Sequence, residues 1–255
     1  KLSQFVKKDL KKLGIKTIFF NEINRPTTNK KVFIAKDYRL LKVDILDNTP
    51  INETLILKIS NQIKKIKTGT IVFSDFRHGI FNSSSVNRFI KSINKNIFKV
   101  GDSQIASRWG NILDFKNFDL ITPNEKEARF ALGDQDSAIR PLGTKLLEQS
   151  GSKSLILTLG ERGILTIRKA KSKNDTRAFF SIDSFATNTK DPVGCGDSLL
   201  SYSALSFKIT NNDLIASIIG SISASLEAEI DGNLPISFES VIRKIKDIEE
   251  KFKFI

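Results

Sequence analysis

The sequence predicts an α/β fold in which a parallel β-sheet is covered by helices on both faces. Short apolar runs typical of strands alternate with amphipathic runs typical of helices, and this alternation favours strand–helix–strand units. The chain has 255 residues, of which 40% are hydrophobic, so it can bury one large core. No repeat, low-complexity linker or break in composition indicates a second domain, and we therefore expect residues 1–255 to form one domain.

The expected elements follow in order along the chain. Residues 1–14, KLSQFVKKDLKKLG, have the spacing of an amphipathic helix and not that of a signal peptide. Five apolar runs predict strands, at residues 16–20, 69–76, 96–103, 118–123 and 152–160. Three amphipathic segments predict helices, at residues 52–66, 84–95 and 124–132, and the last two are expected to begin at Ser and Asn N-caps.

One segment departs from this alternation. Residues 30–46, KKVFIAKDYRLLKVDIL, have no helical period and are predicted to form two extended pieces joined by a polar turn near Lys36 and Asp37. We expect a hairpin that stands apart from the main sheet and lies over a site. Past residue 184 the chain is expected to be mostly helical, and residues 212–230 are rich in small side chains that allow close helix packing.

The charge limits the classes of partner. The formal net charge is +13, from 41 Lys and Arg against 28 Asp and Glu, which favours acidic partners and makes nucleic acid a candidate. The lysines are spread beside apolar positions at helical spacing, which is more typical of solvated helix faces, and phosphorylated small molecules fit the same charge. No apolar run is long enough for a membrane span, and the single cysteine suits a reducing cytoplasm.

A candidate site is the motif Gly194-Cys195-Gly196-Asp197, which leads into a helix expected to begin at about Asp197. Glycines leave backbone N–H groups uncovered, and the positive end of the helix points at the same space, so the turn can bind an anion such as a phosphate. An aspartate there could accept a proton from a hydroxyl that attacks the phosphate. The alternative is an ordinary N-cap after a glycine turn.

Further polar residues follow predicted strands. Asn124 and Glu127 are three residues apart at a helix start, where they form either a capping box or a site that organises water around a magnesium ion. In LILTLGERGILTI, Thr158 and Gly160 end a predicted strand where a nucleotide phosphate could approach, although a tight hairpin explains the same pattern. In VFSDFRHGIF, Asp75 and Gly79 lie just past the end of another predicted strand.

The four segments SDFRHG, TPNEKE, TLGERG and DPVGCGD resemble, in this order, the motifs of the PfkB family of ribokinase-like carbohydrate kinases. They cover most of residues 70–233. Within the family, RPTTNKKVFIAKDYRLLKVD is similar to the lid segment of heptose-phosphate kinases, the kinase half of ADP-heptose synthesis proteins. GDSQIASRWGN, FDLITPNEKEAR and GNLPIS are similar to the same branch.

The resemblance implies a three-layer α/β/α sandwich with a small β lid at about residues 25–46, and transfer of the γ-phosphate of ATP to a sugar hydroxyl with Mg²⁺. Asp197 matches the family's catalytic base, and the amides of Gly194, Cys195 and Gly196 match its anion hole. Asp191 matches the acid that opens the signature.

Other positions match the family's nucleotide and metal motifs. Asn124 and Glu127 match the N-x-x-E motif, which acts on magnesium through water and on phosphates, while Thr158 and Gly160 match nucleotide-contacting positions. Cys195 stands where the family usually has alanine, and at a helix N-terminus we expect a lowered thiol pKa.

The substrate assignment depends on the lid, because the sequence shows no counterpart of the family's opening Gly-Gly segment with its acidic sugar contact. Lys30, Arg39 and Lys42 of the lid are candidates for contact with a phosphate on the sugar, and Asp75 is a further substrate candidate. His78, the only histidine, is interpreted as a loop residue. The lid could also form a homodimer interface.

Three alternatives stay open. The first is a kinase for a hexose, a nucleoside or another small alcohol. The second is a sugar or nucleotide sensor that keeps the fold without turnover, although a binding protein has no need of a base beside an anion hole. The third, a nucleic-acid binder, predicts salt-dependent affinity for DNA or RNA and no nucleotide hydrolysis.

Overall fold

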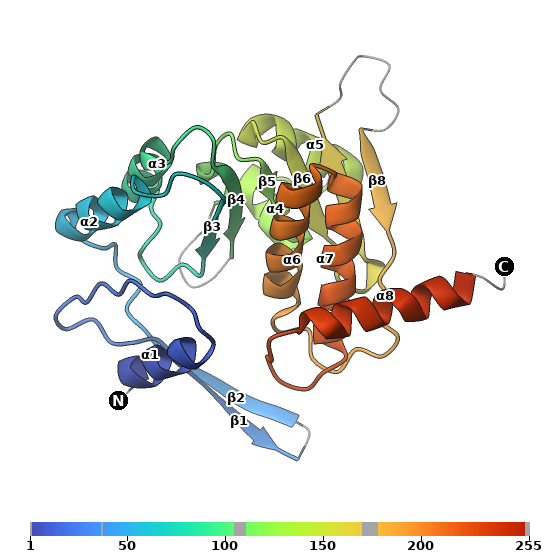
Figure 1. The fold of residues 1–255 in the computed structure, drawn as a ribbon, viewed down its shortest axis with the longest axis horizontal. Helices are drawn as coiled ribbons and strands as arrows, with labels where there is room; N and C mark the ends of the chain where they lie inside the picture. The colour runs from blue at the N-terminus through green and yellow to red at the C-terminus, as the bar shows by residue number, and fades with distance from the viewer. Residues whose placement is uncertain (1, 37, 105–110, 170–177, 253–255) are drawn as a thin grey trace.

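The computed structural model describes residues 2–36, 38–104, 111–169 and 178–252 (Figure 1). Its centre is a six-stranded sheet in the order β3-β4-β5-β6-β7-β8. The strands are β3 (Thr70–Asp75), β4 (Phe98–Ser103), β5 (Leu120–Ile121), β6 (Ser154–Thr158), β7 (Ile164–Arg168) and β8 (Phe179–Ile182). β3 to β6 are parallel, whereas β6, β7 and β8 pair antiparallel. The predicted parallel sheet is therefore a mixed one.

Helices cover both faces of the sheet, as the alternation predicted (Figure 1). One core contains side chains from α2 (Glu53–Ile63), α3 (Ser83–Ser92), α4 (Glu125–Leu132) and α5 (Ile139–Ser150), and the opposite core contains side chains from α6 (Cys195–Thr210) and α7 (Asp213–Ala228). β6 serves both, because Leu155 and Leu157 belong to the first core and Ile156 to the second. The chain thus forms an α/β/α sandwich, which α8 (Phe238–Phe252) completes by packing against α7.

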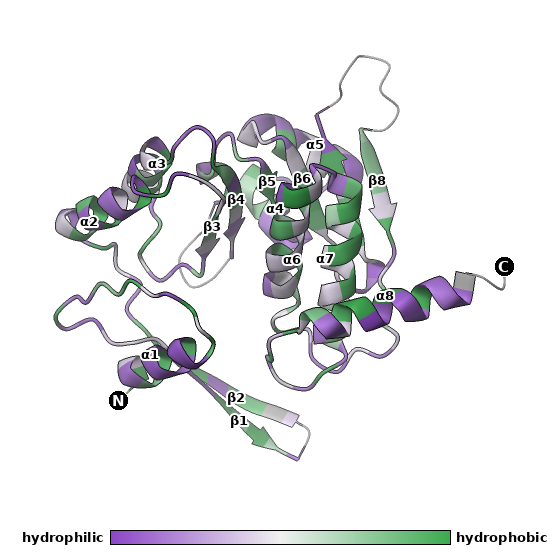
Figure 2. Cartoon of the chain, viewed as in Figure 1, coloured by the Kyte–Doolittle hydropathy of each residue, from purple (hydrophilic) through white to green (hydrophobic). Residues whose placement is uncertain are grey.

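A two-stranded antiparallel hairpin, β1 (Asn29–Ala35) and β2 (Tyr38–Ile45), stands apart from this sheet, as expected for residues 30–46 (Figure 1). We call these two strands the lid. Figure 2 colours much of both strands as hydrophobic, and Phe33, Leu41 and Tyr38 are 52%, 56% and 76% exposed. The lid therefore carries apolar side chains that the body of the protein does not cover.

The N-terminal prediction was right for the helix and wrong for the strand. α1 (Leu2–Lys12) forms, but none of its residues is buried. Residues 16–20 form no strand, because no strand of the described chain lies beside them, and Ile18 is 63% exposed. No helix among the described residues is long and apolar enough to cross a membrane.

Three element boundaries differ from the prediction. α3 begins after Asn82, whose side chain accepts from the Ser85 amide while Ser85 Oγ accepts from the Asn82 amide, so the N-cap is asparagine and not serine. The predicted strand at 118–123 shrinks to Leu120 and Ile121. α6 begins at Cys195 and not at Asp197, since Gly194 with φ +96° serves as its N-cap.

Candidate active site

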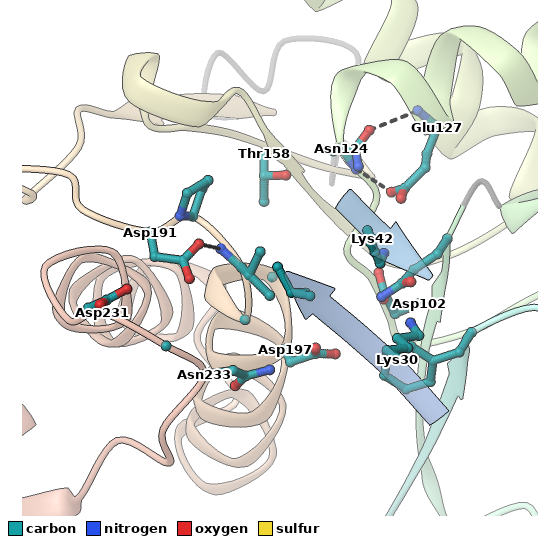
Figure 3. A pocket seen from close by; sticks show the side chains of 18 of the residues that line it. Lys30, Lys42, Asp102, Asn124, Glu127, Thr158, Asp191, Asp197, Asp231 and Asn233 are labelled. Atoms are coloured by element: carbon teal, nitrogen blue, oxygen red, sulfur yellow. Dashed lines mark hydrogen bonds between the residues drawn. The ribbon is translucent and has the colours of Figure 1, made fainter. Parts of the chain in front are cut away.

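A cavity of about 930 Å³ lies between the lid, the carboxyl ends of the parallel strands and the N-terminus of α6 (Figure 3). The lid contributes Lys30, Val32, Ile34, Leu40, Leu41 and Lys42 to its wall. The body contributes Phe76, Asp102, Gln104, Thr122, Asn124, Glu127, Thr158, Asp191, Pro192, Val193, Gly194, Gly196, Asp197, Asp231, Gly232 and Asn233. The position agrees with the general location of ligand sites in open α/β sheets.

The turn before α6 places Gly194 and Gly196 in the wall of this cavity, while the amide of Cys195 donates to the Pro192 carbonyl at 3.4 Å. Gly194 has φ +96°, and a Cβ there would lie 2.6 Å from Glu227 Oε1 and 2.8 Å from Asn233 Oδ1, so only glycine fits. The N-cap of α6 is Gly194, which has no side chain to accept from the first-turn amides. The Asp191 carboxylate instead accepts from the Val193 amide at 3.0 Å and shapes the turn. Because the first-turn N–H groups of a helix have no acceptor within it, this end of α6 can bind an anion.

Asp197 lies in the first turn of α6, and its side chain lines the cavity (Figure 3). Burial raises the pKa of this carboxyl, and the positive charge of Lys30, across the cavity on the lid, opposes the rise. A carboxylate with a raised pKa is a better proton acceptor than one exposed to water, which suits a general base.

Asn124 and Glu127 form the predicted capping box at the start of α4, and both also line the cavity. Glu127 Oε2 accepts from the Asn124 amide at 2.7 Å, and Asn124 Oδ1 accepts from the Glu127 amide at 2.9 Å (Figure 3). The box holds both side chains at the edge of the cavity, so the capping interpretation and the functional one apply to the same pair. Thr158 lies beside Asn124 through an isolated parallel bridge between the strand ends.

Asp102 is a cavity residue that the sequence analysis did not single out. It precedes the last residue of β4, and Thr122 Oγ1 donates to its carboxylate at 3.2 Å. Burial, together with the negative charges of Glu127 and Asp197, raises the pKa of Asp102 to about 8. The available signal was its place at a strand's carboxyl end, within the segment GDSQIASRWGN that resembles the heptose-phosphate kinases. Asn233 lies in GNLPIS, which is similar to the same branch, whereas Asp231 had no such signal.

A second cavity of about 390 Å³ adjoins the first and shares Asn124, Thr158, Pro192 and Gly196 with it. Its other lining residues are Gly160, Glu161, Gly163, Ile164, Ser184, Ala186, Thr189, Cys195, Leu199, Ser221, Ala224, Ser225 and Ala228. The residues predicted to contact a nucleotide, Thr158 and Gly160, are thus brought together here. The walls are largely apolar, and the turn of α6 lies between the two cavities.

The prediction for the Cys195 thiol was wrong. The pKa of this thiol is raised to about 11, and not lowered, because the thiol is withdrawn from water and lies near the negative charges of Glu227 and Asp191. These two effects outweigh the favourable position at a helix N-terminus. Cys195 is therefore a small side chain in the wall of the second cavity and not an activated nucleophile.

Some of the predicted substrate residues line the larger cavity, and others do not. Lys30 and Lys42 line the cavity from the lid (Figure 3). Arg39 belongs to β2, but its side chain lies outside the described residues. Asp75 is not among the residues that line either cavity: it is 2% exposed, forms an ion pair with Arg77 and accepts from Ser103 Oγ at 3.2 Å. Its contact with a substrate therefore stays a prediction, while the contacts in the structure tie it to Arg77 and Ser103.

His78 lies in the loop after β3, as interpreted from the sequence, with Nδ1 3.3 Å from Thr28 Oγ1. Burial, and secondly the positive charge of Lys30, lower its pKa.

The donor set of the larger cavity fits a magnesium ion bound through water and phosphate. Glu127 and Asp197 supply carboxylate oxygens and Asn124 an amide oxygen, which are the ligand types that Mg²⁺ prefers. Within the described part of the chain, no three acidic, histidine or cysteine side chains are arranged to hold a metal ion by themselves. An ion here would therefore keep waters and take oxygens from a bound phosphate.

Residues 1–213 match the family model of the pfkB carbohydrate kinases, and the chain therefore belongs to this family of sugar kinases. The relatives it matches include the bifunctional protein HldE of Nitratiruptor sp., 26% identical over 262 aligned residues, covering 93% of this chain and 52% of the relative. HldE of Aliarcobacter butzleri is 28% identical, covering 75% of this chain and 38% of the relative. The chain thus spans about half, or less, of the length of these relatives.

Solved structures support the fold. A ribokinase from Thermotoga maritima superposes with a TM-score of 0.71 at 22% identity, covering 96% of this chain and 78% of the ribokinase. A ribokinase from Giardia lamblia superposes with a TM-score of 0.72 at 17% identity, covering 99% and 80%. The fold is ribokinase-like, as the resemblance implied.

Proposed function

We propose that this sugar kinase transfers the γ-phosphate of ATP to a hydroxyl of a heptose or heptose phosphate, with Asp197 as the general base. The observation that carries the proposal is the position of Asp197. It lies beside the uncapped N-terminus of α6, in a cavity that a basic lid faces from the other side. The similarity to HldE proteins and the lid sequence favour a heptose.

The reaction is assigned to this chain's residues as follows. Asp197 accepts the proton of the sugar hydroxyl while the hydroxyl oxygen forms its bond to the γ-phosphorus, and the bond from that phosphorus to the bridging oxygen of ADP breaks. The amides of the 194–197 turn donate to the oxygens of the transferred group, where negative charge develops. Raising the pKa of Asp197 by burial strengthens it as the acceptor.

The nucleotide is assigned to the second cavity, with its base against the apolar walls and its phosphates directed toward Gly196, which both cavities share. Asn124 and Glu127 would hold a magnesium ion through its waters. When bound, this ion supplies positive charge to the phosphates of ATP.

The substrate proposal assigns Lys30 and Lys42 to a phosphate already present on the sugar, because both amines lie on the cavity side of the lid. Arg39 stays a candidate for the same role.

A cytoplasmic location and a homodimer through the exposed apolar lid residues complete the proposal. Phe33→Glu should lower the mass measured by light scattering to that of a monomer. A parent protein that is already monomeric would contradict the proposed homodimer.

The test of the proposed function measures magnesium-dependent ADP release with heptoses, heptose 7-phosphates, hexoses and nucleosides, beside Lys30→Gln and Lys42→Gln. Turnover with a heptose 7-phosphate, and a KM for that substrate raised about tenfold or more in the lysine variants, supports the full proposal. Turnover with a hexose or nucleoside alone would contradict the heptose substrate and support the kinase activity. ATP binding without turnover on any member favours a sensor.

A further inference from the structure

The lid is joined to the body by two chain segments, residues 21–28 and 46–52, and the side chain of Arg25 lies where they meet. Nη1 donates to the carbonyl oxygen of Asp47 and Nη2 to that of Thr49, both at 2.9 Å. Longer contacts reach the Pro50 carbonyl and, in the loop after β3, the His78 carbonyl, both at 3.5 Å. One guanidinium therefore contacts both lid connections and the body.

We call the place where residues 21–28 and 46–52 meet at Arg25 the junction. The ion pair of Arg25 connects the junction to α2. Arg25 Nε donates to one oxygen of Glu22, and Asn52 Nδ2 donates to the other at 2.8 Å. Asn52 is the N-cap of α2. The Arg25 side chain is only 18% exposed, so these bonds are partly withdrawn from water. Arginine has five N–H donors in a fixed plane, whereas lysine has three on a single flexible nitrogen, and so lysine cannot reproduce the set.

The body side of the junction is tightly packed. The amide of Ile51 donates to the Gly79 carbonyl at 3.0 Å, and a Cβ on Gly79, whose φ is +88°, would lie 1.9 Å from the Thr49 carbonyl oxygen. The Asp47 carboxylate accepts from the Thr49 amide at 2.8 Å and from its hydroxyl at 2.6 Å. The carbonyls that Arg25 contacts are therefore held in a fixed arrangement.

Beyond this junction, the lid also meets the body where Lys30 Nζ lies 5.8 Å from the centre of the Phe76 ring. β1 and β2 pair with each other, and neither pairs with a strand of the six-stranded sheet. A strand the length of β1 is ~23 Å long, so a rotation of ~5° at the base moves its far end by ~2 Å. A displacement of ~1 Å in an active site can cost up to ~10²-fold in rate. The arrangement at the base therefore decides where Lys30, Val32 and Ile34 lie over the cavity.

We propose that Arg25 is a positioning residue that sets the angle of the lid over the active site and so determines sugar affinity and the exclusion of water. Arg25 does not line either cavity, and it acts through the lid residues that do. The proposal rests on the proposed function for its kinetic consequences. Its structural consequence, a fixed lid angle, can be measured without any substrate.

Nucleotide binding should not respond to this residue, because the described residues that line the second cavity include none from the lid. We therefore expect Arg25→Gln to raise the KM for the sugar about tenfold or more while the Kd for ATP changes less than twofold. ATP hydrolysis without sugar should rise relative to transfer, since a displaced lid admits water. Arg25→Lys should raise the KM for the sugar and the ATP hydrolysis without sugar by less than Arg25→Gln does, because lysine keeps the charge beside Glu22.

The matched control is Arg88→Gln, which also removes one arginine from an ion pair with a glutamate, Glu53, but at an exposed position. Glu53 follows Asn52 directly, and its ion pair with Arg88 does not involve Arg25 or Glu22. It should leave both constants at the parent values. If Arg25→Gln changes only the melting temperature, or raises the ATP and sugar constants equally, the positioning role is wrong.

The second measurement uses spin labels at Tyr38→Cys on the lid and Lys208→Cys on α6, both exposed in the parent, with Cys195→Ala as the background. Pulsed electron–electron distance measurements should give one narrow distribution with Arg25 and with Arg88→Gln, and a broader or shifted one with Arg25→Gln and Arg25→Lys. Identical distributions would overturn the proposal even if the kinase activity is confirmed. A broadened distribution without detectable sugar turnover would support the positioning role of Arg25 and contradict only the assigned substrate.

Discussion

Asp102 should make the stability of the protein depend on pH in a way that one substitution removes. Its pKa is about 8 in the folded protein against an ordinary value of 3.8, because burial disfavours the carboxylate and Glu127 and Asp197 add negative charge. Between these values the folded state holds a proton that the unfolded state has released. The contribution of Asp102 to the free energy of unfolding is therefore most favourable below about pH 4, and it is lost as the pH rises toward 8.

The magnitude follows from the proton difference. One proton bound in the folded state only lowers the free energy of unfolding by up to ~1.4 kcal/mol for each pH unit. Between pH 5 and 7, the parent should lose up to ~3 kcal/mol relative to Asp102→Asn, which keeps an acceptor for Thr122 but does not titrate. At pH 5 the two proteins should differ least, and at pH 8 the variant should be clearly the more stable.

Urea unfolding followed by circular dichroism at pH 5, 6, 7 and 8 measures this difference. Asp9→Asn, at an exposed residue of α1, controls for the loss of one negative charge. If the unfolding free energies of Asp102→Asn and the parent run parallel across this range, Asp102 is ionised throughout and the assigned environment is incorrect.

Three further predictions concern the two cavities. Gly194→Ala should weaken ATP binding and lower turnover at least about tenfold, because its Cβ meets Glu227 and Asn233; unchanged nucleotide titration would contradict the crowding. Glu127→Gln should raise the magnesium concentration needed for half-maximal activity, and an identical magnesium titration removes its role. Iodoacetamide should alkylate Cys195 much more slowly than glutathione at pH 7.5, and more slowly still with ATP; fast alkylation would mean an ionised thiol.

The sequence was most informative where local patterns determine the structure. The alternation of apolar and amphipathic runs placed β3, β4 and β6 and their helices, and the loss of helical period at residues 30–46 located the lid. Asn124 and Glu127 were found because a capping box is a local motif of four residues. The glycines of the 194–197 turn were found for the same reason.

The features that were missed depend on contacts between distant segments. Residues 16–20 have strand composition, but a strand needs a neighbour, and the described chain places none beside them. Asp75 and Asp102 both follow strand residues, and only tertiary packing decides that the first pairs with Arg77 while the second reaches the cavity. The thiol pKa of Cys195 was mispredicted because burial and Glu227, 32 residues away, outweigh the helix terminus.

The role of Asp197 as the base is the central claim, and Asp197→Asn tests it most directly. The variant keeps the size of the side chain and removes its ability to accept the proton. In the ADP-release assay with the best sugar of the panel, we expect turnover to fall by ~10² to 10⁴-fold while the Kd for ATP stays within about twofold of the parent. Full turnover in Asp197→Asn would contradict the assignment and require another proton acceptor in this cavity.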